Sequence, residues 1–466
     1  MKFAIGYNYD INLLNLLEIY KKDIEAFYFP IPQIYLGSGR AIKEPKSYTN
    51  EIPLIIKKCC ALNIKPQLLL NATYEDISSF SKRFFNSMLT YIKKLRDAGL
   101  SSIVVVNPIY ISLIRKEISD ITIESSVNCY MKTLEHALHH KELGVDVLTI
   151  DRDINRNIPL IKEIKNKTGL KLRVMLNEGC VGGCPYRNHH SNHLLTGFNL
   201  PRKPVEGVLW GMFCIEIYRR DPLKLFRIPF IPPEAVSRYE EFVDYCKLST
   251  RVFPTYRIET CLKAYIDRHF SGNLLTILDS PGISYFEYAD YGILKKNNFF
   301  KKMLTCNLEC RTCRYCRVLF KKAVMIKRDY QGKRGKEDER KCIEFYKKNL
   351  KLPLKNKREK IKSYIKIAES YLKLGRYEEG IRNARRALKL NYMVSDAYCI
   401  LGFCYEAVKN FKEAIEVLKI AEKISPKKRS IKLALARCYK ELGESTLQNK
   451  EIDKIIKSAV LSRPKL

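Results

Sequence analysis

The chain has 466 residues and a formal net charge of +34, from 84 Lys and Arg side chains against 50 Asp and Glu. This length exceeds one ordinary domain and suffices for two or three. Hydrophobic residues make up 46% of the sequence, which excludes a disordered polycation. No apolar run is long enough to span a membrane, and 16 cysteines without a signal-peptide pattern predict a reducing, cytoplasmic location.

The first half of the chain alternates apolar, strand-like runs with amphipathic helical segments. Helical spacing over residues 79–98 and 131–143 ends at Gly99 and Gly144, which is typical of helix C-termini. Strands are expected at residues 3–7, 26–29 (with 34–36 as an extension), 67–70, 103–106, 122–125, 145–150 and 172–176, with 209–215 as a weaker candidate. Seven or eight strand–helix units in about 220 residues favour an α/β fold, a (β/α)8 TIM-like barrel, over an open sheet.

Polar residues follow several of the expected strands directly. In a (β/α)8 barrel the chemistry lies at the C-terminal ends of the strands. The candidates there are Asn71, Asn107, Asn128, Asp151 and Glu178. Simple capping of the following turn or helix would select the same residue types, so both interpretations stay open.

A thirty-four-residue repeat marks the C-terminal region. Small residues and tyrosines recur with this period, at Ala368, Gly402 and Ala436 and at Tyr371, Tyr405 and Tyr439. The period is that of a tetratricopeptide repeat, in which paired helices stack closely. About three units are expected over residues 361–450, followed by a tail at 451–466. Such a region predicts binding of a protein partner, with self-association or packing onto the first domain as the alternative.

Two cysteine groups point to soft metal ions. Cys180 and Cys184 lie in a Gly-rich loop after the seventh expected strand, and Cys214 follows the next apolar run. Thiolates in such a loop suit a metal or iron–sulfur centre. A denser group, in the segment 281–320, comprises Cys306, Cys310, Cys313 and Cys316. Zinc and a 4Fe-4S cluster both accept four thiolates, so the second group does not choose between them.

The positive charge is concentrated in the last third of the chain. Residues 301–466 hold 44 basic and 19 acidic side chains, a net charge of +25. The richest stretch, residues 321–360, is expected to be a basic linker between the cysteine segment and the repeats. It is either a solvated linker or a patch that binds RNA through its phosphates.

Four short stretches in the first 270 residues carry a resemblance to a known family. They are residues 34–40 (Ile-Tyr-Leu-Gly-Ser-Gly-Arg), 68–72 (Leu-Leu-Leu-Asn-Ala), 123–128 followed by 142–145, and 244–251 (Asp-Tyr-Cys-Lys-Leu-Ser-Thr-Arg). Their order and spacing resemble the collagenase-like peptidase family, the U-32 peptidases. The resemblance implies a barrel over residues 1–280 with a cysteine-bound 4Fe-4S cluster near the strand C-termini. It also implies functions that include RNA hydroxylation and oxygen-independent ubiquinone hydroxylation.

The cysteines depart from the pattern of that family. At most three candidates lie at the rim of the barrel, Cys180, Cys184 and Cys214, and a fourth would have to come from Cys261 or from the Cys306–Cys316 group. The alternative is two separate centres. The sequence does not decide between one centre and two.

No zinc-protease HExxH motif and no recognisable nucleophile turn occurs in the sequence, which favours cluster chemistry over proteolysis. Lys247 and Arg251 are candidates for holding an anionic ligand, with a salt bridge as the alternative, and Glu178 is the third candidate catalytic residue. The leading hypothesis is an iron–sulfur-dependent enzyme acting on RNA or on a small aromatic or quinone-type metabolite. A U-32-type peptidase and a non-catalytic, metal-stabilised scaffold are the alternatives.

Overall fold

The computed structural model describes residues 1–36, 39, 44–73, 77–192, 210–306, 309–310, 312–327, 336–351, 356–426, 428–449 and 451–453. The chain forms two compact units, Met1–Tyr330 and Gln331–Leu466. Within the described residues, no helix combines the length and the apolar character that crossing a bilayer requires.

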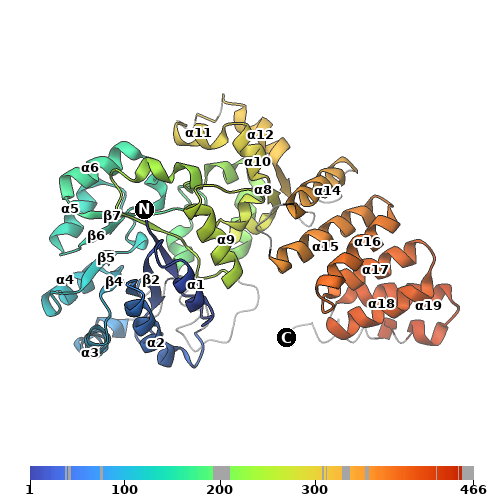
Figure 1. The fold of residues 1–466 in the computed structure, drawn as a ribbon, viewed down its shortest axis with the longest axis horizontal. Coiled ribbons are helices and arrows are strands. Elements are labelled where there is room, and N and C mark those ends of the chain that lie inside the picture. The colour runs from blue at the N-terminus through green and yellow to red at the C-terminus, as the bar shows by residue number, and fades with distance from the viewer. Residues whose placement is uncertain are drawn as a thin grey trace. The chain divides into compact units, whose positions relative to one another are not determined.

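The N-terminal unit is built on a closed barrel of eight parallel strands (Figure 1). The strands are β1 (Phe3–Gly6), β2 (Ile24–Pro30), β3 (Lys65–Leu70), β4 (Ser102–Val105), β5 (Thr122–Ser125), β6 (Val147–Thr149), β7 (Lys171–Met175) and β8 (Tyr245–Lys247). Each pairs with the next, and β8 pairs with β1 to close the barrel. The predicted (β/α)8 fold is confirmed.

Helices cover the outside of the barrel (Figure 1). They are α1 (Leu13–Ile19), α2 (Tyr48–Ala61), α3 (Lys82–Asp97), α4 (Pro108–Glu117), α5 (Leu134–Glu142), α6 (Ile158–Thr168), α8 (Trp210–Arg220) and α9 (Thr255–Ile266). Helix α3 begins after Ser81, whose side chain accepts a hydrogen bond from the Phe84 amide. Gly99 and Gly144 follow α3 and α5 with φ of +107° and +94°, values that favour glycine. Both predicted helices therefore end where the sequence indicates.

The eighth strand lies elsewhere than predicted. Residues 210–215 of the expected 209–215 strand belong to the eleven-residue helix α8, and Leu209 lies outside the described residues. A short apolar run does not distinguish a strand from a helix, and this one continues as a helix to Arg220. The strand that closes the barrel is β8, only three residues long, within the family-like stretch 244–251. Residues 34–36 form a turn and do not extend β2.

The cysteine-rich segment belongs to the barrel unit. It contains β9 (Phe286–Ala289), α10 (Tyr291–Lys296), α11 (Phe299–Leu304), α12 (Tyr315–Ala323) and β10 (Val324–Ile326). Strands β9 and β10 pair antiparallel, and Phe286, Phe299 and Leu319 are buried in the same core as the barrel. The N-terminal unit therefore extends past residue 280 to Tyr330.

The segment 321–360, expected to be a linker, is largely regular structure. It includes the end of α12, strand β10, helix α14 (Lys336–Leu350) and the start of α15 (Lys357–Lys373). Its described residues are 321–327, 336–351 and 356–360, and the Lys333-Arg334 pair lies outside them. Part of the basic segment is thus folded into the two units.

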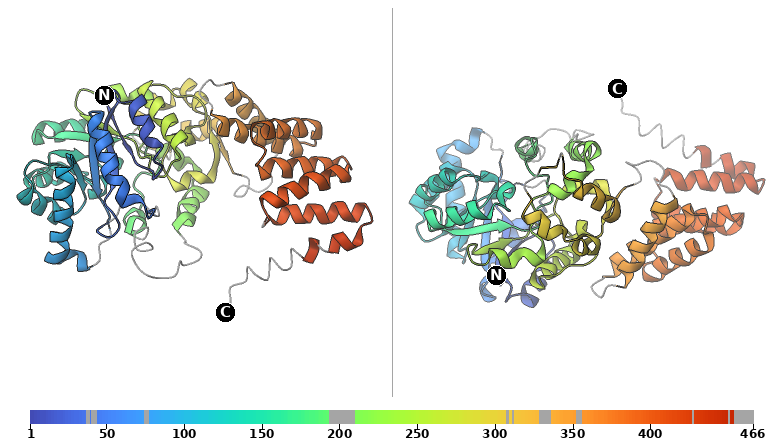
Figure 2. Two further views of the ribbon diagram at one scale, coloured as in Figure 1. Left: turned by 60° about the horizontal axis from the view of Figure 1, so that its bottom comes forward. Right: turned by 90° about the horizontal axis from the view of Figure 1, so that it is seen from above.

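The C-terminal unit consists of stacked helices, as Figure 2 shows. After α15 follow α16 (Tyr377–Leu390), α17 (Ser395–Ala407), α18 (Phe411–Ile424) and α19 (Arg429–Glu441). A Cβ on Gly402 would approach Leu418 Cγ to 2.4 Å, and one on Gly380 would approach Cys404 Sγ to 2.8 Å. The repeating small residues are therefore points of close helix packing, as predicted for tetratricopeptide repeats.

Candidate functional site at the C-terminal mouth of the barrel

The three rim cysteines lie in one neighbourhood. Cys180 and Cys184 occupy the loop after β7, and Cys214 lies on α8. Burial and the charge of Cys184 raise the pKa of the Cys214 thiol. The pKa of Tyr218 is raised mainly by burial. Negative charge on Cys180, Cys214, Glu178 and Cys184 raises it further. Tyr218 lies one turn after Cys214 on α8, and all three thiols are near enough to act on its pKa electrostatically.

The loop that carries Cys180 and Cys184 is held in place by Asp153. The Gly183 amide donates to Asp153 Oδ1 at 3.0 Å, and Arg187 Nη1 lies 2.8 Å from Asp153 Oδ2. Arg187 Nη2 also donates to the Val181 carbonyl at 2.8 Å. Burial opposes ionisation of Asp153, but its hydrogen bonds from Lys132 and Gly183 and the Arg187 charge outweigh it and lower its pKa. The thiol loop is thus fixed before any ligand binds.

Glu178 supports the same loop. Its Oε1 accepts a hydrogen bond from the Cys180 amide at 2.8 Å, and its Oε2 lies 3.3 Å from Arg152 Nη1. Arg152 in turn donates to Asn128 Oδ1 at 3.0 Å. Glu178 is 1% exposed. These contacts are those of a positioning residue, which sets the direction of the Cys180 backbone.

Tyr218 is buried and packs closely against its neighbours beside Cys214. Tyr218 is 1% exposed, and its hydroxyl is buried without a hydrogen-bond partner. A Cβ on Gly282 would come within 2.9 Å of Tyr218 Cε2 and 3.1 Å of Cys214 Cβ, so glycine is needed there. A buried donor without an acceptor, beside three soft thiols, fits a metal–sulfur group that would supply the acceptor.

The thiols are not yet arranged as ligands. In the part of the chain that the structure describes, no three His, Cys, Asp or Glu side chains form a group that could hold a metal ion. Binding would therefore require rotation of the cysteine side chains. Cys261, one suggested fourth ligand, is fully buried on α9, where its thiol lies 3.6 Å from the Ile277 carbonyl and 3.7 Å from Asn177 Nδ2.

The second cysteine group has its own surroundings. The pKa of Cys316 is raised to about 11, mainly by burial and then by the charges of Cys306, Cys310 and Cys313. The positive charge of Arg227 opposes this increase. Arg227 ends the 3₁₀ helix Pro222–Arg227, and a Cβ on Gly182 would lie 3.1 Å from its carbonyl oxygen. This short helix therefore lies near both the thiol loop and the second group.

Lys247 and Arg251 lie at the C-terminal end of β8 and shortly after it, on the side of β1 and β2. Lys247 ends β8 and pairs in register with Met175, the last residue of β7. Its Nζ lies 4.2 Å from the centroid of the Tyr28 ring, and burial lowers its pKa to about 8. Arg251 is 6% exposed, and a Cβ on Gly6 would come within 2.4 Å of its Cγ. Two buried cations thus occupy this side of the mouth.

Several other strand-end residues are caps. Asn107 accepts from the Ile109 amide at the start of α4, and Asp151 accepts from the Asp153 amide. Asn71 accepts from the Gly39 amide at 3.1 Å. The capping interpretation therefore accounts for Asn107 and Asp151, whereas Asn71 connects the end of β3 to the segment after β2. The sequence did not point to Tyr218, Arg152, Asp153 or Arg187, although Arg152 and Asp153 directly follow the expected sixth strand.

Comparisons with known proteins divide the chain in the same way. The model of peptidase family U32 matches residues 18–182, and a tetratricopeptide-repeat model matches residues 361–392 and 395–428. A Methanocaldococcus jannaschii protein named as an uncharacterized protease is 26% identical over 310 residues, which cover 66% of this chain and 91% of that protein. A solved U32 peptidase aligns at 18% identity and a TM-score of 0.40, over 54% of this chain and 93% of its own. A tetratricopeptide-repeat protein of Thermus thermophilus aligns at 18% identity and a TM-score of 0.23, over 26% of this chain and 66% of its own.

Proposed function

We propose that this chain, a peptidase family U32 domain joined to tetratricopeptide repeats, is an iron–sulfur-dependent enzyme with its active site at the C-terminal mouth of the barrel. Its reaction is hydroxylation or a related modification of RNA or of a small aromatic or quinone-type metabolite. The proposal is supported by the position of Cys180 and Cys184 in the loop after β7 and of Cys214 on α8, all near enough to the buried, unpaired Tyr218 hydroxyl to raise its pKa.

In this proposal the three thiolates hold a 4Fe-4S cluster. A 4Fe-4S cluster usually has four cysteine ligands, so three cysteines leave one iron of the cluster without a protein ligand. The cluster would supply electron transfer or a Lewis-acidic iron for a substrate oxygen. Tyr218 would donate its hydroxyl hydrogen bond to the bound group, and Asp153 and Arg187 would keep the loop fixed while it binds.

Lys247 and Arg251 would bind an anionic part of the substrate. Arginine offers a fork of donors to a carboxylate or phosphate, and lysine offers a point charge. Because the pKa of Lys247 is about 8, its charge is lost in the mildly alkaline range. Binding of an anion at this position should therefore weaken as the pH rises through 8.

The Cys306–Cys316 group is proposed as a second centre with a structural role. Its four cysteines are partly or fully exposed, and one metal ion bound by their thiolates would neutralise the charges that raise the pKa of Cys316. Zinc and a second 4Fe-4S cluster are both compatible with four thiolates. Metal analysis distinguishes them.

Anaerobic purification of the full chain, followed by iron, sulfide and zinc analysis, tests the proposal. Single Cys180→Ser, Cys184→Ser and Cys214→Ser variants should lose the iron and the visible absorption of the first centre, while their circular dichroism stays unchanged. Cys59→Ser is the matched control, because that thiol is buried on α2 and belongs to neither cysteine group, and it should keep its iron. A colourless wild-type protein that contains only zinc would contradict the redox role.

A peptidase is the second candidate function, because the curated relative at 26% identity is named as a protease. Incubation of the full chain with an unfolded protein under metal-replete conditions tests it. Cleavage that persists in Cys180→Ser would favour a peptidase without a cluster. A lack of cleavage would count against this candidate. Loss of the barrel fold in Cys180→Ser would instead favour a non-catalytic scaffold.

The other parts of the chain are proposed to recruit partners. Stacked repeats of this kind present an extended concave surface, which suits a protein partner. The basic residues of segment 321–360 are proposed to contact RNA phosphates. RNA affinity should then fall steeply with salt, and deletion of the segment should flatten that slope, whereas salt-independent binding would exclude this role.

A further inference from the structure

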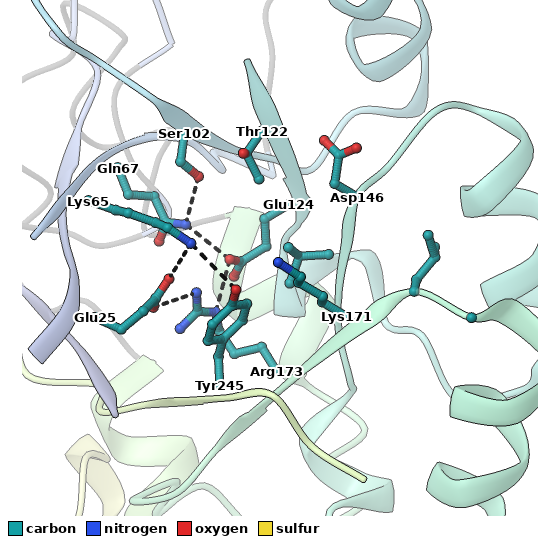
Figure 3. A pocket seen from close by; sticks show the side chains of 13 residues that line it. Glu25, Lys65, Gln67, Ser102, Thr122, Glu124, Asp146, Lys171, Arg173 and Tyr245 are labelled. Atoms are coloured by element: carbon teal, nitrogen blue, oxygen red, sulfur yellow. Dashed lines mark hydrogen bonds and ion pairs between the residues drawn. The ribbon is translucent and has the colours of Figure 1, made fainter. Parts of the chain in front are cut away.

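The buried cations at the N-terminal end of the barrel are paired with carboxylates. Arg173 on β7 donates from Nε to Glu124 Oε2 at 2.9 Å and from Nη2 to Glu25 Oε2 at 3.1 Å. Gln67 Nε2 donates to the same Glu124 oxygen at 3.0 Å. Lys65, in the wall of the adjoining cavity, lies 3.3 Å from Glu25 Oε1, as Figure 3 shows. This N-terminal network therefore supplies its own counterions.

Helix α12 presents cations that have no such partners. It belongs to the barrel unit and lies beside α10 (Figure 1). Arg314 at its N-cap and Arg317, Lys321 and Lys322 within it are all exposed. In the part of the chain that the structure describes, the side chain of none of the four makes an ion pair or a hydrogen bond. Four positive charges are therefore left without protein counterions.

The four cations lie on one face of the helix. Their positions, i, i+3, i+7 and i+8, form a single stripe that spans about 12 Å at 1.5 Å per residue. The opposite face carries Leu319 and Ala323, which are buried in the core of the barrel unit. The fold therefore fixes which way the cationic stripe points.

The sequence around α12 contains almost no acidic residue. Residues 291–328 include eleven Lys and Arg but only one acidic side chain, Glu309. Like charges three or four positions apart on a helix, such as Arg317 and Lys321, repel each other and destabilise it. A polyanion bound to this face would replace the repulsion by attraction.

We infer that the exposed face of α12, formed by Arg314, Arg317, Lys321 and Lys322, binds the phosphate backbone of single-stranded RNA. A line of cations follows a backbone whose charges recur regularly, and it releases the counterions of that backbone. A bilayer surface does not fit, because an interfacial helix inserts its apolar face, and that of α12 is buried in the core. The inference rests on the proposed function for the choice of RNA as the polyanion. It assigns the contact to one helix face of the barrel unit, of which only two residues belong to segment 321–360.

Salt-dependent binding of a fluorescently labelled, mixed-sequence, single-stranded RNA to the full chain tests the inference. The variant Arg314→Gln/Arg317→Gln/Lys321→Gln/Lys322→Gln removes four phosphate contacts, each of which contributes about 0.7 to the slope of log K against log salt. The slope should therefore flatten by about 3, and the affinity at 50–100 mM salt should fall by on the order of a hundredfold. A slope and an affinity equal to those of the wild type would overturn the inference.

Two further variants separate charge from folding, because Arg314 and Arg317 lie next to cysteines. Lys321→Gln/Lys322→Gln lies more than a turn after Cys316 and should flatten the slope by about half as much. Arg314→Lys/Arg317→Lys keeps both charges and should bind RNA like the wild type, since lysine also contacts phosphate as a point charge. Equal loss of binding in this variant and in the fourfold variant would assign the effect to the fold of the cysteine segment, against the inference.

The matched control removes the same charge from other helices of the barrel unit. It replaces four exposed lysines of α2, α3, α4 and α6 by glutamine, namely Lys57, Lys94, Lys116 and Lys167. The control should keep the slope of the wild type. A slope as flat as that of the α12 variant would mean that net charge, and not this face, attracts RNA. Competition by polyglutamate as strong as that by unlabelled RNA would assign the face to an acidic protein and overturn the inference.

Iron analysis of the same preparations keeps this inference apart from the proposed function. Protein that holds iron, and whose RNA binding is the same in the wild type and in the fourfold variant, would refute the α12 face alone. Protein without iron, whose RNA binding depends on α12, would refute the iron–sulfur enzyme alone.

Discussion

Replacement of Lys247 by methionine should stabilise the barrel unit by about 3 kcal/mol at pH 7. The Lys247 side chain is 7% exposed. Burial, helped by the charges of Arg173 and Arg251 and opposed by that of Glu124, lowers its pKa from 10.5 to about 8. At about 1.4 kcal/mol for each pH unit, this difference gives the stated free energy. Methionine fills a similar volume and carries no charge that must be buried.

The stabilisation by Lys247→Met should decrease as the pH rises. Between pH 8 and 10.5 the unfolded chain keeps the Lys247 proton while the folded chain has lost it, so wild-type stability rises with pH in this window. The advantage of Lys247→Met is therefore full below pH 8 and fades towards pH 10.5. Urea unfolding at pH 7 and pH 10, with pulse proteolysis to report on the barrel, measures both values. A variant less stable than the wild type at pH 7, or a gain that does not shrink at pH 10, would refute the reasoning.

Lys65→Met is the matched control, with the opposite expectation. Burial disfavours the Lys65 ammonium, but Glu25 and Tyr245 outweigh this and raise its pKa. Its contribution to stability is present in full below pH 10.5 and is lost as the pH rises through its higher folded value. Lys65→Met should therefore destabilise the barrel at pH 7. A stabilising effect of both variants would show that apolar packing, rather than charge burial, is responsible.

Two further substitutions test the two ends of the barrel. Glu124→Gln leaves the buried Arg173 with only Glu25 as its counterion. The free energy of unfolding, measured in urea, should therefore fall by about 3–5 kcal/mol. An unchanged free energy of unfolding would mean that the network is dispensable. Tyr218→Phe removes a hydroxyl that has no partner, so the metal-free protein should keep its melting temperature, whereas the reconstituted iron–sulfur protein should show a shifted electron paramagnetic resonance spectrum. An identical spectrum would place Tyr218 away from the centre.

The fold was predictable from the sequence wherever apolar runs were long. Seven strands of the barrel lie within a residue or two of their predicted bounds, because most of them are buried parallel strands rich in apolar residues. Strand β8 has only the sequence Tyr245-Cys246-Lys247, with one fully buried apolar residue, Cys246. Pairing with β1 and β7, rather than local sequence, makes it a strand.

The candidate site was predictable only in part. Cys180 and Cys184 stood out because two thiols in a Gly-rich loop are unusual in a reduced protein. Tyr218 did not, because an aromatic residue on an amphipathic helix has the same local signature whether it packs in a core or faces a ligand. Its significance comes from residues 34 and 38 positions earlier in the chain, which only the fold brings to it.

The charged network at the other end did leave a signal. Gln67, Glu124 and Arg173 are buried polar residues in the middle of their strands, and they contact one another. A buried charge inside a strand costs free energy unless an opposite charge pairs with it. Acidic and basic residues within the strands of one barrel are therefore expected to pair with each other.

Lys247 connects the two ends of the barrel through electrostatics. Its pKa responds to Glu124 and Arg173 of the N-terminal network, and also to Arg251 at the C-terminal mouth. The Glu124 carboxylate favours the Lys247 ammonium, so any change that neutralises this carboxylate lowers the pKa of Lys247 and removes positive charge from the C-terminal end of β8.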